Sequence, residues 1–171
     1  MEFIWQSADY DKMSANLRKS PEVMLAGLNR ALRKIGQLMV PALKAETPVG
    51  ASHHLRNYTV GEVKGRGQDQ VLEIRQAAAS RKGYFYGMAV RGGSRPHFPP
   101  SAELIPWVQA VLGVNAKEAP GVAFLVARKI SKVGTKPNPY HARALAANMG
   151  NIQAIVEQEG VAIMGRLANT K

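Results

Sequence analysis

Histidines are the side chains of this sequence that could carry acid–base or metal chemistry at neutral pH. There are four, His53, His54, His97 and His141. Adjacent residues of a regular strand point to opposite faces, so His53 and His54 would not grip one metal from a strand, and we interpret them as surface residues. Neither His97 nor His141 has an Asp or Glu close in sequence. A hydrolase built on one of these two histidines stays an open alternative.

Carboxylates and catalytic motifs are scarce. Only Glu103 and Glu118 lie between Glu73 and Glu157, so a nuclease that needs clustered acids for two metal ions is poorly supplied. The serine-hydrolase elbow, the His-Glu-x-x-His zinc motif and the phosphate-binding loop are all absent. The lack of cysteine excludes a disulfide scaffold, a thiol nucleophile and a cysteine-ligated metal. The sequence therefore predicts a protein that is not an enzyme and has no cofactor or metal.

The charge of the chain is strongly positive and unevenly distributed. Its 171 residues include 23 Lys and Arg against 12 Asp and Glu, which gives +11, and residues 74–156 hold 11 basic and two acidic residues. Such a segment attracts polyanions, although ordinary solvated surface cations are an equal alternative. No zinc-finger spacing, RNA-binding signature or basic leucine-zipper region points to sequence-specific readout. The residues we expect to face a polyanion are Arg81, Lys82, Arg91, Arg128, Lys129 and Lys132.

A long helix over residues 20–46 is the main element on which the other elements pack. Ser20 is a good cap, Pro21 suits the first helical position, and an apolar stripe follows at alternating spacings of three and four. The stripe consists of Leu25, Leu28, Leu32, Ile35, Met39 and Ala42. It predicts packing on a sheet, with a coiled-coil seam as the alternative. Residues 1–19 form an N-terminal arm, in which Phe3, Ile4 and Trp5 fit either a strand or an arm.

The remaining elements complete a single α+β domain over residues 1–171, in which the long helix packs on a small antiparallel sheet and further helices follow. A β-rich part spans residues 55–90, with strands at 55–63, 70–75 and 83–90; in the first strand Leu55, Tyr58 and Val60 are candidate inward positions. A helical part spans residues 101–168, with helices at 101–112, 118–132 and from about 140 to 167, the last divided by Gly150 and Gly160. No apolar run reaches the ~20 residues of a membrane span, and the N-terminus lacks a signal-peptide pattern.

Two proline-rich loops combine a basic residue with an aromatic. They are Arg95-Pro96-His97-Phe98-Pro99 and Lys136-Pro137-Asn138-Pro139-Tyr140. Rigid prolines hold an aromatic side chain in a fixed direction at low entropic cost, so we expect a packing or interface role. Ordinary turns that lead into helices are the alternative.

A series of short motifs follows in a characteristic order along the chain. They are Thr47-Pro48-Val49-Gly50, Leu55-Arg56, the Tyr84 and Tyr86 strand, Arg95-Pro96-His97, the Trp107 helix, Ala127-Arg128-Lys129-Ile130, Gly134-Thr135-Lys136-Pro137-Asn138-Pro139-Tyr140 and Ala142 to Leu145. Their order resembles the tail-component family of long-tailed bacteriophages, which are small head–tail joining, tail-completion and neck proteins. The similarity spans roughly residues 20–146. It departs from the family pattern at Ser52-His53, where a Thr-Gly pair is typical.

The resemblance implies a structural virion protein of the tail or neck, made in the host cytoplasm. It implies a homo-oligomeric ring, commonly of six subunits, that completes the tail at its head-proximal end and contacts the tail tube and the head–tail connector or neck proteins. DNA would pass through the ring without sequence-specific binding, and no membrane or catalytic residue is involved. The alternative is a small basic nucleic-acid-binding protein. The expected interface residues are Pro48, Leu55, Arg56, Arg95, Pro96, His97, Phe98, Lys136, Pro137 and Tyr140.

Overall fold

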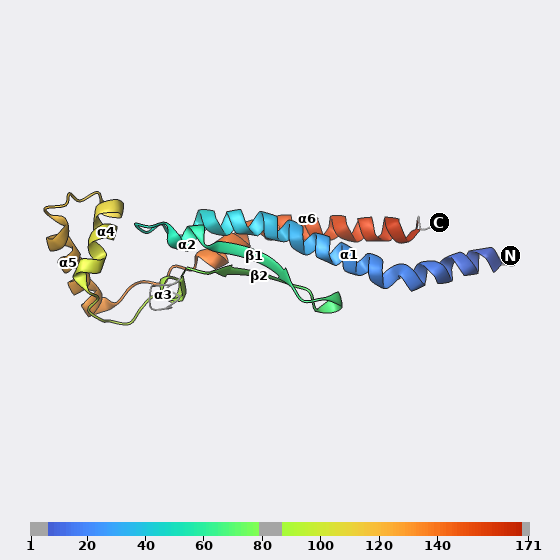
Figure 1. Cartoon of the computed structure of the whole chain (residues 1–171), viewed down its shortest axis with the longest axis horizontal. Helices are drawn as coiled ribbons and strands as arrows, with labels where there is room; N and C mark the ends of the chain where they lie inside the picture. The colour runs from blue at the N-terminus through green and yellow to red at the C-terminus, as the bar shows by residue number, and fades with distance from the viewer. Residues whose placement is uncertain (1–6, 79–86, 169–171) are drawn as a thin grey trace. The chain divides into compact units, whose positions relative to one another are not determined.

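The computed structural model of the chain describes residues 7–78 and 87–168, apart from the side chains of residues 7–17 and 19. As predicted, the fold is mixed, with a long N-terminal helix, a two-stranded antiparallel sheet and several helices toward the C-terminus (Figure 1). The elements are α1 (Ser7–Glu46), α2 (His54–Asn57), β1 (Thr59–Lys64), the 3-10 turn η1 (Gly67–Asp69), β2 (Val71–Gln76), α3 (Gly87–Gly92), α4 (Ser101–Leu112), α5 (Ala119–Val133) and α6 (Tyr140–Ala168).

The first helix, α1, begins at Ser7, so the predicted start at Ser20 is wrong. Residues 7–19 contain no glycine or proline, and Asp9 and Asp11 lie in the early turns, where the positive helix end favours acidic residues. Pro21 removes one hydrogen bond from the helix interior without ending the helix. The signals that favour a helix start at Pro21 are thus also compatible with a helix that passes through it.

The hairpin formed by β1 and β2 differs from the prediction in its first strand. Residues 54–57 form the single helical turn α2, and β1 starts only at Thr59. This turn shifts the alternation of side chains by one residue. Leu55 and Thr59 are consequently buried, whereas Tyr58 and Val60, predicted to point inward, are exposed.

A third strand over residues 83–90 is not formed where the structure describes that segment. Residues 87–90 lie in α3, and the remainder of the predicted strand lies outside the described residues. Met88 and Ala89 are good helix formers, whereas the prediction relied on the aromatic residues that precede them.

The C-terminal helices agree closely with their predicted bounds, but two details do not. Helix α6 continues without interruption through Gly150 and Gly160, each of which has open space around it and costs only about 1 kcal/mol relative to alanine. In α5 the fully buried face consists of Ala119, Ala123 and Ala127, while Leu125, predicted to point inward, is 60% exposed.

The chain forms two compact units, and α1, the hairpin and α6 each contribute residues to both. Unit 1 comprises Met1–Leu38, Gly61–Glu73 and Asn148–Lys171, and unit 2 comprises Met39–Val60 and Ile74–Ala147. In unit 1, α1 and α6 lie side by side, and Leu72 of the hairpin lies against Gly36 of α1 (Figure 1). In unit 2, α4 and α5 pack around the buried Val108.

Candidate functional site

The two proline-rich loops lie side by side in unit 2. Ser94 and Thr135 form an isolated antiparallel bridge, in which the Ser94 amide donates to the Thr135 carbonyl at 3.2 Å and the Thr135 amide donates to the Ser94 carbonyl at 3.1 Å. Their hydroxyl oxygens are also 2.9 Å apart. The bridge joins segments that are 41 residues apart in sequence, so the two loops form one structural feature.

Two glycines make this pairing possible. Gly93 and Gly134 have φ angles of 73° and 68°, in the region that L side chains avoid. A Cβ atom on Gly93 would meet the Thr135 carbonyl oxygen, and one on Gly134 would meet that of Ser94. Both positions therefore require glycine.

Most of the predicted interface residues on the paired loops are exposed. They are Arg95, Pro96, His97, Phe98, Lys136 and Pro137. The His97 Nδ1 donates to the Arg95 carbonyl oxygen at 2.9 Å and so stabilises the turn. The Phe98 ring lies 6.0 Å from the Phe124 ring of α5, and both side chains are about half exposed. We call Phe98 and Phe124 the aromatic pair; it is an apolar contact surface at the edge of the loops.

Tyr140, also predicted for the interface, is instead fully buried within unit 2. Its hydroxyl donates to Oε1 of Gln76, and Nε2 of Gln76 donates to the hydroxyls of Thr47 and Thr59 at 3.0 and 3.3 Å. Each threonine hydroxyl in turn donates to the carbonyl oxygen four residues earlier. Gln76 is thus the centre of a buried polar network that joins α1, the hairpin and α6.

The electrostatics around Tyr140 favour its neutral form. Burial raises the pKa of Tyr140, and the hydrogen bond to Gln76 and the charge of Arg91 oppose that rise. Burial, followed by the charge of Arg91, lowers the pKa of the adjacent His141, whose Nδ1 is buried without a hydrogen-bond partner. Gln76, Arg91 and His141 line a small cavity of about 110 Å³, together with Gly87 and Met88. In the described residues no cluster of His, Asp or Glu could hold a metal ion.

The predicted interface residues that follow the first helix, Pro48, Leu55 and Arg56, make contacts within the chain. Arg56 Nε donates to the Lys44 carbonyl at 2.8 Å and thereby caps the C-terminus of α1. Leu55 is buried and Pro48 is half-buried. The exposed loop residues therefore remain as candidates for contact with a partner, whereas Leu55, Arg56 and Tyr140 hold unit 2 together.

The basic residues expected to face a polyanion are only partly described. Arg128, Lys129 and Lys132 are exposed on α5, and Arg91 is exposed on α3. The ion pairs seen in residues 7–78 and 87–168 involve other cations. Arg81 and Lys82 lie outside the described residues.

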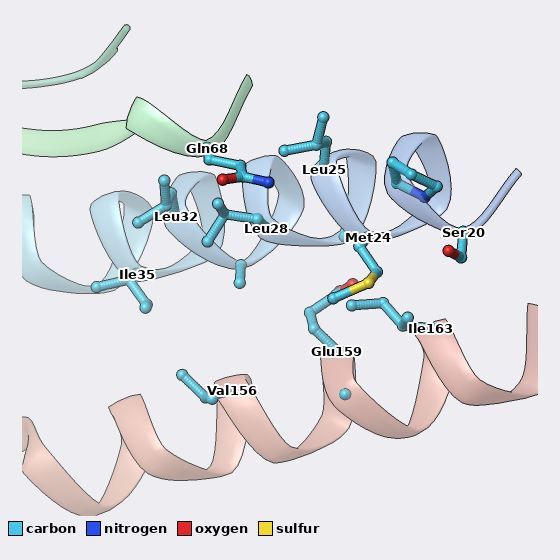
Figure 2. Close-up of a pocket in the computed structure, with 14 residues that line it drawn as sticks. Ser20, Met24, Leu25, Leu28, Leu32, Ile35, Gln68, Val156, Glu159 and Ile163 are labelled. Carbon is cyan, nitrogen blue, oxygen red and sulfur yellow. The ribbon is translucent and has the colours of Figure 1, made fainter. Parts of the chain in front are cut away.

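Unit 1 contains an apolar groove that sequence reasoning missed. Four of the six residues in the predicted packing stripe of α1 are only half-buried and line a cavity of about 570 Å³; they are Leu25, Leu28, Leu32 and Ile35. Met39 of the same stripe is buried, in unit 2. Figure 2 shows Val156 and Ile163 of α6 directed toward α1, with Gln68 of the hairpin tip on the opposite side of the groove. Among the described side chains of unit 1, Ala31 is the only buried hydrophobic one.

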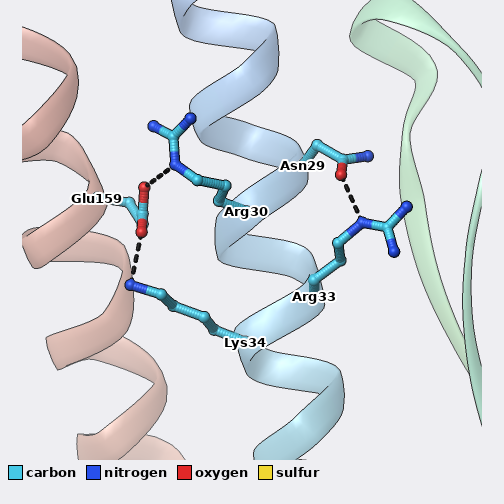
Figure 3. Close-up of polar contacts among 5 residues, drawn as sticks. All are labelled: Asn29, Arg30, Arg33, Lys34 and Glu159. Atoms are coloured by element: carbon cyan, nitrogen blue, oxygen red, sulfur yellow. Dashed lines mark hydrogen bonds and ion pairs between the residues drawn. The ribbon is translucent and has the colours of Figure 1, made fainter. Parts of the chain in front are cut away.

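Ion pairs and the close approach of Gly27 to Ile163, rather than the leucine stripe, join α6 to α1 in unit 1. Glu159, whose side chain is 7% exposed, receives Arg30 Nε at 3.0 Å and Lys34 Nζ at 2.7 Å (Figure 3). The hydrogen bond from Lys34 is the main reason that the pKa of Glu159 is lowered; Arg30 adds to this effect, and burial opposes it. Beside this ion pair, Gly27 of α1 and Ile163 of α6 approach closely, because a Cβ on the glycine would meet the isoleucine side chain. We call Arg30, Lys34 and Glu159 the charged clasp.

Comparison of the chain with protein-family models, curated protein sequences and solved structures finds no match. Within the described ranges, none of the helices combines the length and the apolar character that a bilayer-spanning segment needs.

Proposed function

We propose that this chain is a structural, non-enzymatic subunit of a bacteriophage tail or neck. It would form a homo-oligomeric ring around the DNA channel at the head-proximal end of the tail, and would complete the tail and join it to the head. The order of sequence motifs supports the tail-component family. The observation that carries self-assembly is the groove of unit 1, where the apolar stripe of α1 lacks a cover.

An uncovered apolar groove of this kind is costly for a monomer. Soluble monomers rarely expose large contiguous apolar surfaces, and those that do generally use them for binding. A long amphipathic stripe of this kind would normally form a core. In unit 1 its leucines remain half-buried, which supports a second chain as the missing partner.

A ring subunit also needs more than one contact surface. A head-to-tail interface joins two different patches of the same chain, and rings above and below need further ones. The aromatic pair in unit 2 offers such a surface, because Phe98 is 54% exposed and Phe124 is 50% exposed. The exposed Arg95 and Lys136 beside it would contact acidic groups of a neighbouring ring.

The test is disruption of the gene in the phage that carries it, with the lysate imaged by negative-stain electron microscopy. Filled heads beside separate tails would support a joining or completion role, and overlong tails would support a terminator. Complementation with wild type and Phe98→Leu should restore infectious particles, whereas Phe98→Asp should not, because a carboxylate cannot replace the apolar contact. Intact infectious particles after gene disruption would refute the proposal.

A nucleic-acid-binding protein is the second candidate. It is favoured by the exposed cations Arg128, Lys129 and Lys132, which gather on one helix where their charges can contact phosphates together. Duplex binding that falls steeply with salt would support it. Ring assembly without such binding would favour the first proposal.

A further inference from the structure

The groove of unit 1 has a shape that restricts what can fill it. Met24, Leu28 and Ile35 of α1 form its floor, Val156 and Ile163 of α6 form one wall, and the hairpin tip at Gln68 lies on the other side (Figure 2). A cavity of about 150 Å³ is enough to hold a benzene ring. A groove of about 570 Å³ therefore has room for two aromatic rings and an aliphatic side chain.

The sequence contains a segment of that composition at its N-terminus. Phe3, Ile4 and Trp5 are three consecutive large apolar residues that precede α1. Aromatic side chains bury roughly 150–250 Å² each, so this arm gains most from an apolar groove. We propose that Phe3, Ile4 and Trp5 of one copy of this chain bind in the unit 1 groove of a second copy. This inference rests on the proposed function, because it names the contact that links neighbouring subunits.

The length of α1 is the reason that the arm must come from another copy. Leu28, in the middle of the groove, is 21 residues after Ser7, which corresponds to about 31 Å along a helix. Phe3 precedes Ser7 by four residues, and four extended residues span at most about 14 Å. An arm that folds back along its own helix therefore stops well short of the middle of its own groove.

Tryptophan fluorescence tests this contact directly. The chain has two tryptophans, so Trp107→Phe leaves Trp5 as the single reporter. In this background we expect Trp5 emission to shift to shorter wavelength and acrylamide quenching to fall several-fold as protein concentration drives assembly, measured beside sedimentation velocity. Met24→Glu, which places a carboxylate in the groove at a residue that is 55% exposed, should abolish both changes. Val161→Glu is the matched control, because Val161 is 74% exposed on α6 outside the groove, and it should change neither.

A mixing experiment shows whether the arm acts between chains. A variant lacking residues 2–6 has a free groove and no arm, and the Met24→Glu variant has an arm and a blocked groove. Each alone should remain monomeric, and together they should form a one-to-one dimer that cannot grow, since only one arm and one groove are functional in the pair.

The outcomes separate this inference from the proposed function. Rings formed by the variant that lacks residues 2–6 would overturn the role of the arm and leave ring assembly intact; the groove would then hold another part of the neighbour. Protection of Trp5 in the monomer would also overturn it, because the arm would be packed within its own chain. Full-length protein that stays monomeric with Trp5 exposed at every concentration would overturn both.

Discussion

Replacement of Gln76 by leucine should destabilise unit 2 more than any other single polar substitution in the described part of the chain. The Gln76 side chain accepts from Tyr140 and donates to Thr47 and Thr59, three partners that are each at most 2% exposed. Leucine has a similar size and no hydrogen-bonding atom. The substitution therefore removes all three hydrogen bonds in one step.

The size of the effect follows from the partners. A hydrogen bond contributes about 1 kcal/mol net, and a buried group left without a partner costs about 1–3 kcal/mol. The Tyr140 hydroxyl is the group left alone, because the hydroxyls of Thr47 and Thr59 keep their own bonds to main-chain carbonyls. Apolar burial of leucine offsets part of the loss. We expect a loss of about 3 kcal/mol, which for a chain of this length lowers Tm by roughly 6–12 °C.

Urea unfolding at matched, low protein concentration measures this loss. Gln153→Leu, at an exposed position of α6, is the matched control and should change stability by less than about 0.5 kcal/mol. Tyr140→Phe should cost about 1 kcal/mol, and the double variant should be less destabilised than the sum, because both substitutions remove the same bond. A loss below about 1 kcal/mol for Gln76→Leu would show that the network does not stabilise the fold.

Three further predictions concern the loop pairing, the charged clasp and the basic helix. Gly134→Ala should destabilise the protein by about 1–3 kcal/mol in thermal unfolding, because alanine must adopt a positive φ against the Ser94 carbonyl, whereas Gly121→Ala in open space on α5 should be neutral or stabilising. Because Lys34 and Arg30 lower the pKa of Glu159 in the folded state, the stability they provide is present above the usual carboxyl pKa of 4.5 and is lost as pH falls through the lowered value. The stability of wild type should therefore fall more steeply below pH 4.5 than that of Glu159→Gln; equal slopes in Tm against pH would contradict the ion pairing. If the protein binds duplex DNA through α5, reversing the charge of Arg128, Lys129 and Lys132 should weaken binding for all sequences and reduce the salt slope of log K by about 3, whereas an unchanged slope would exclude this helix as the contact.

The C-terminal helices were predictable because their apolar periodicity reflects local geometry, whereas the short helices α2 and α3 were missed. α4 and α5 lie within a residue or two of their predicted bounds, and α6 failed only in its expected division at Gly150 and Gly160. The start of α1 was missed because a serine followed by proline can occur both at the start of a helix and inside a longer one. The face of α5 was missed because residue size was used as a guide, whereas a close helix contact selects the small Ala123.

The candidate site was predictable only in part. The composition of residues 91–100 and 133–139 marked both proline-rich loops, but nothing local indicates that Gly93 and Gly134 let their backbones pair. The Gln76 network is likewise invisible in the sequence, because its members come from four separate segments. Long-range hydrogen bonds of this kind depend on the assembled fold and have no periodic pattern.

The groove and the charged clasp have a common origin in the faces of α1. At 100° per residue, Arg30 and Lys34 lie on one side of the helix, Gly36 lies on another, and Leu28 and Ile35 lie between them. The chain packs α6 against the first side through Glu159 and packs the hairpin against the second through Leu72. Its own elements therefore cover the polar and small positions of α1, and the apolar positions between them stay open.

Burying a carboxylate between two cations gives weak net stability, but it fixes where α6 lies. An apolar residue at position 159 would instead favour movement of α6 onto the leucine stripe, which would close the groove. The clasp thus leaves the apolar residues between these two sides of α1 open, as the proposed ring assembly would require.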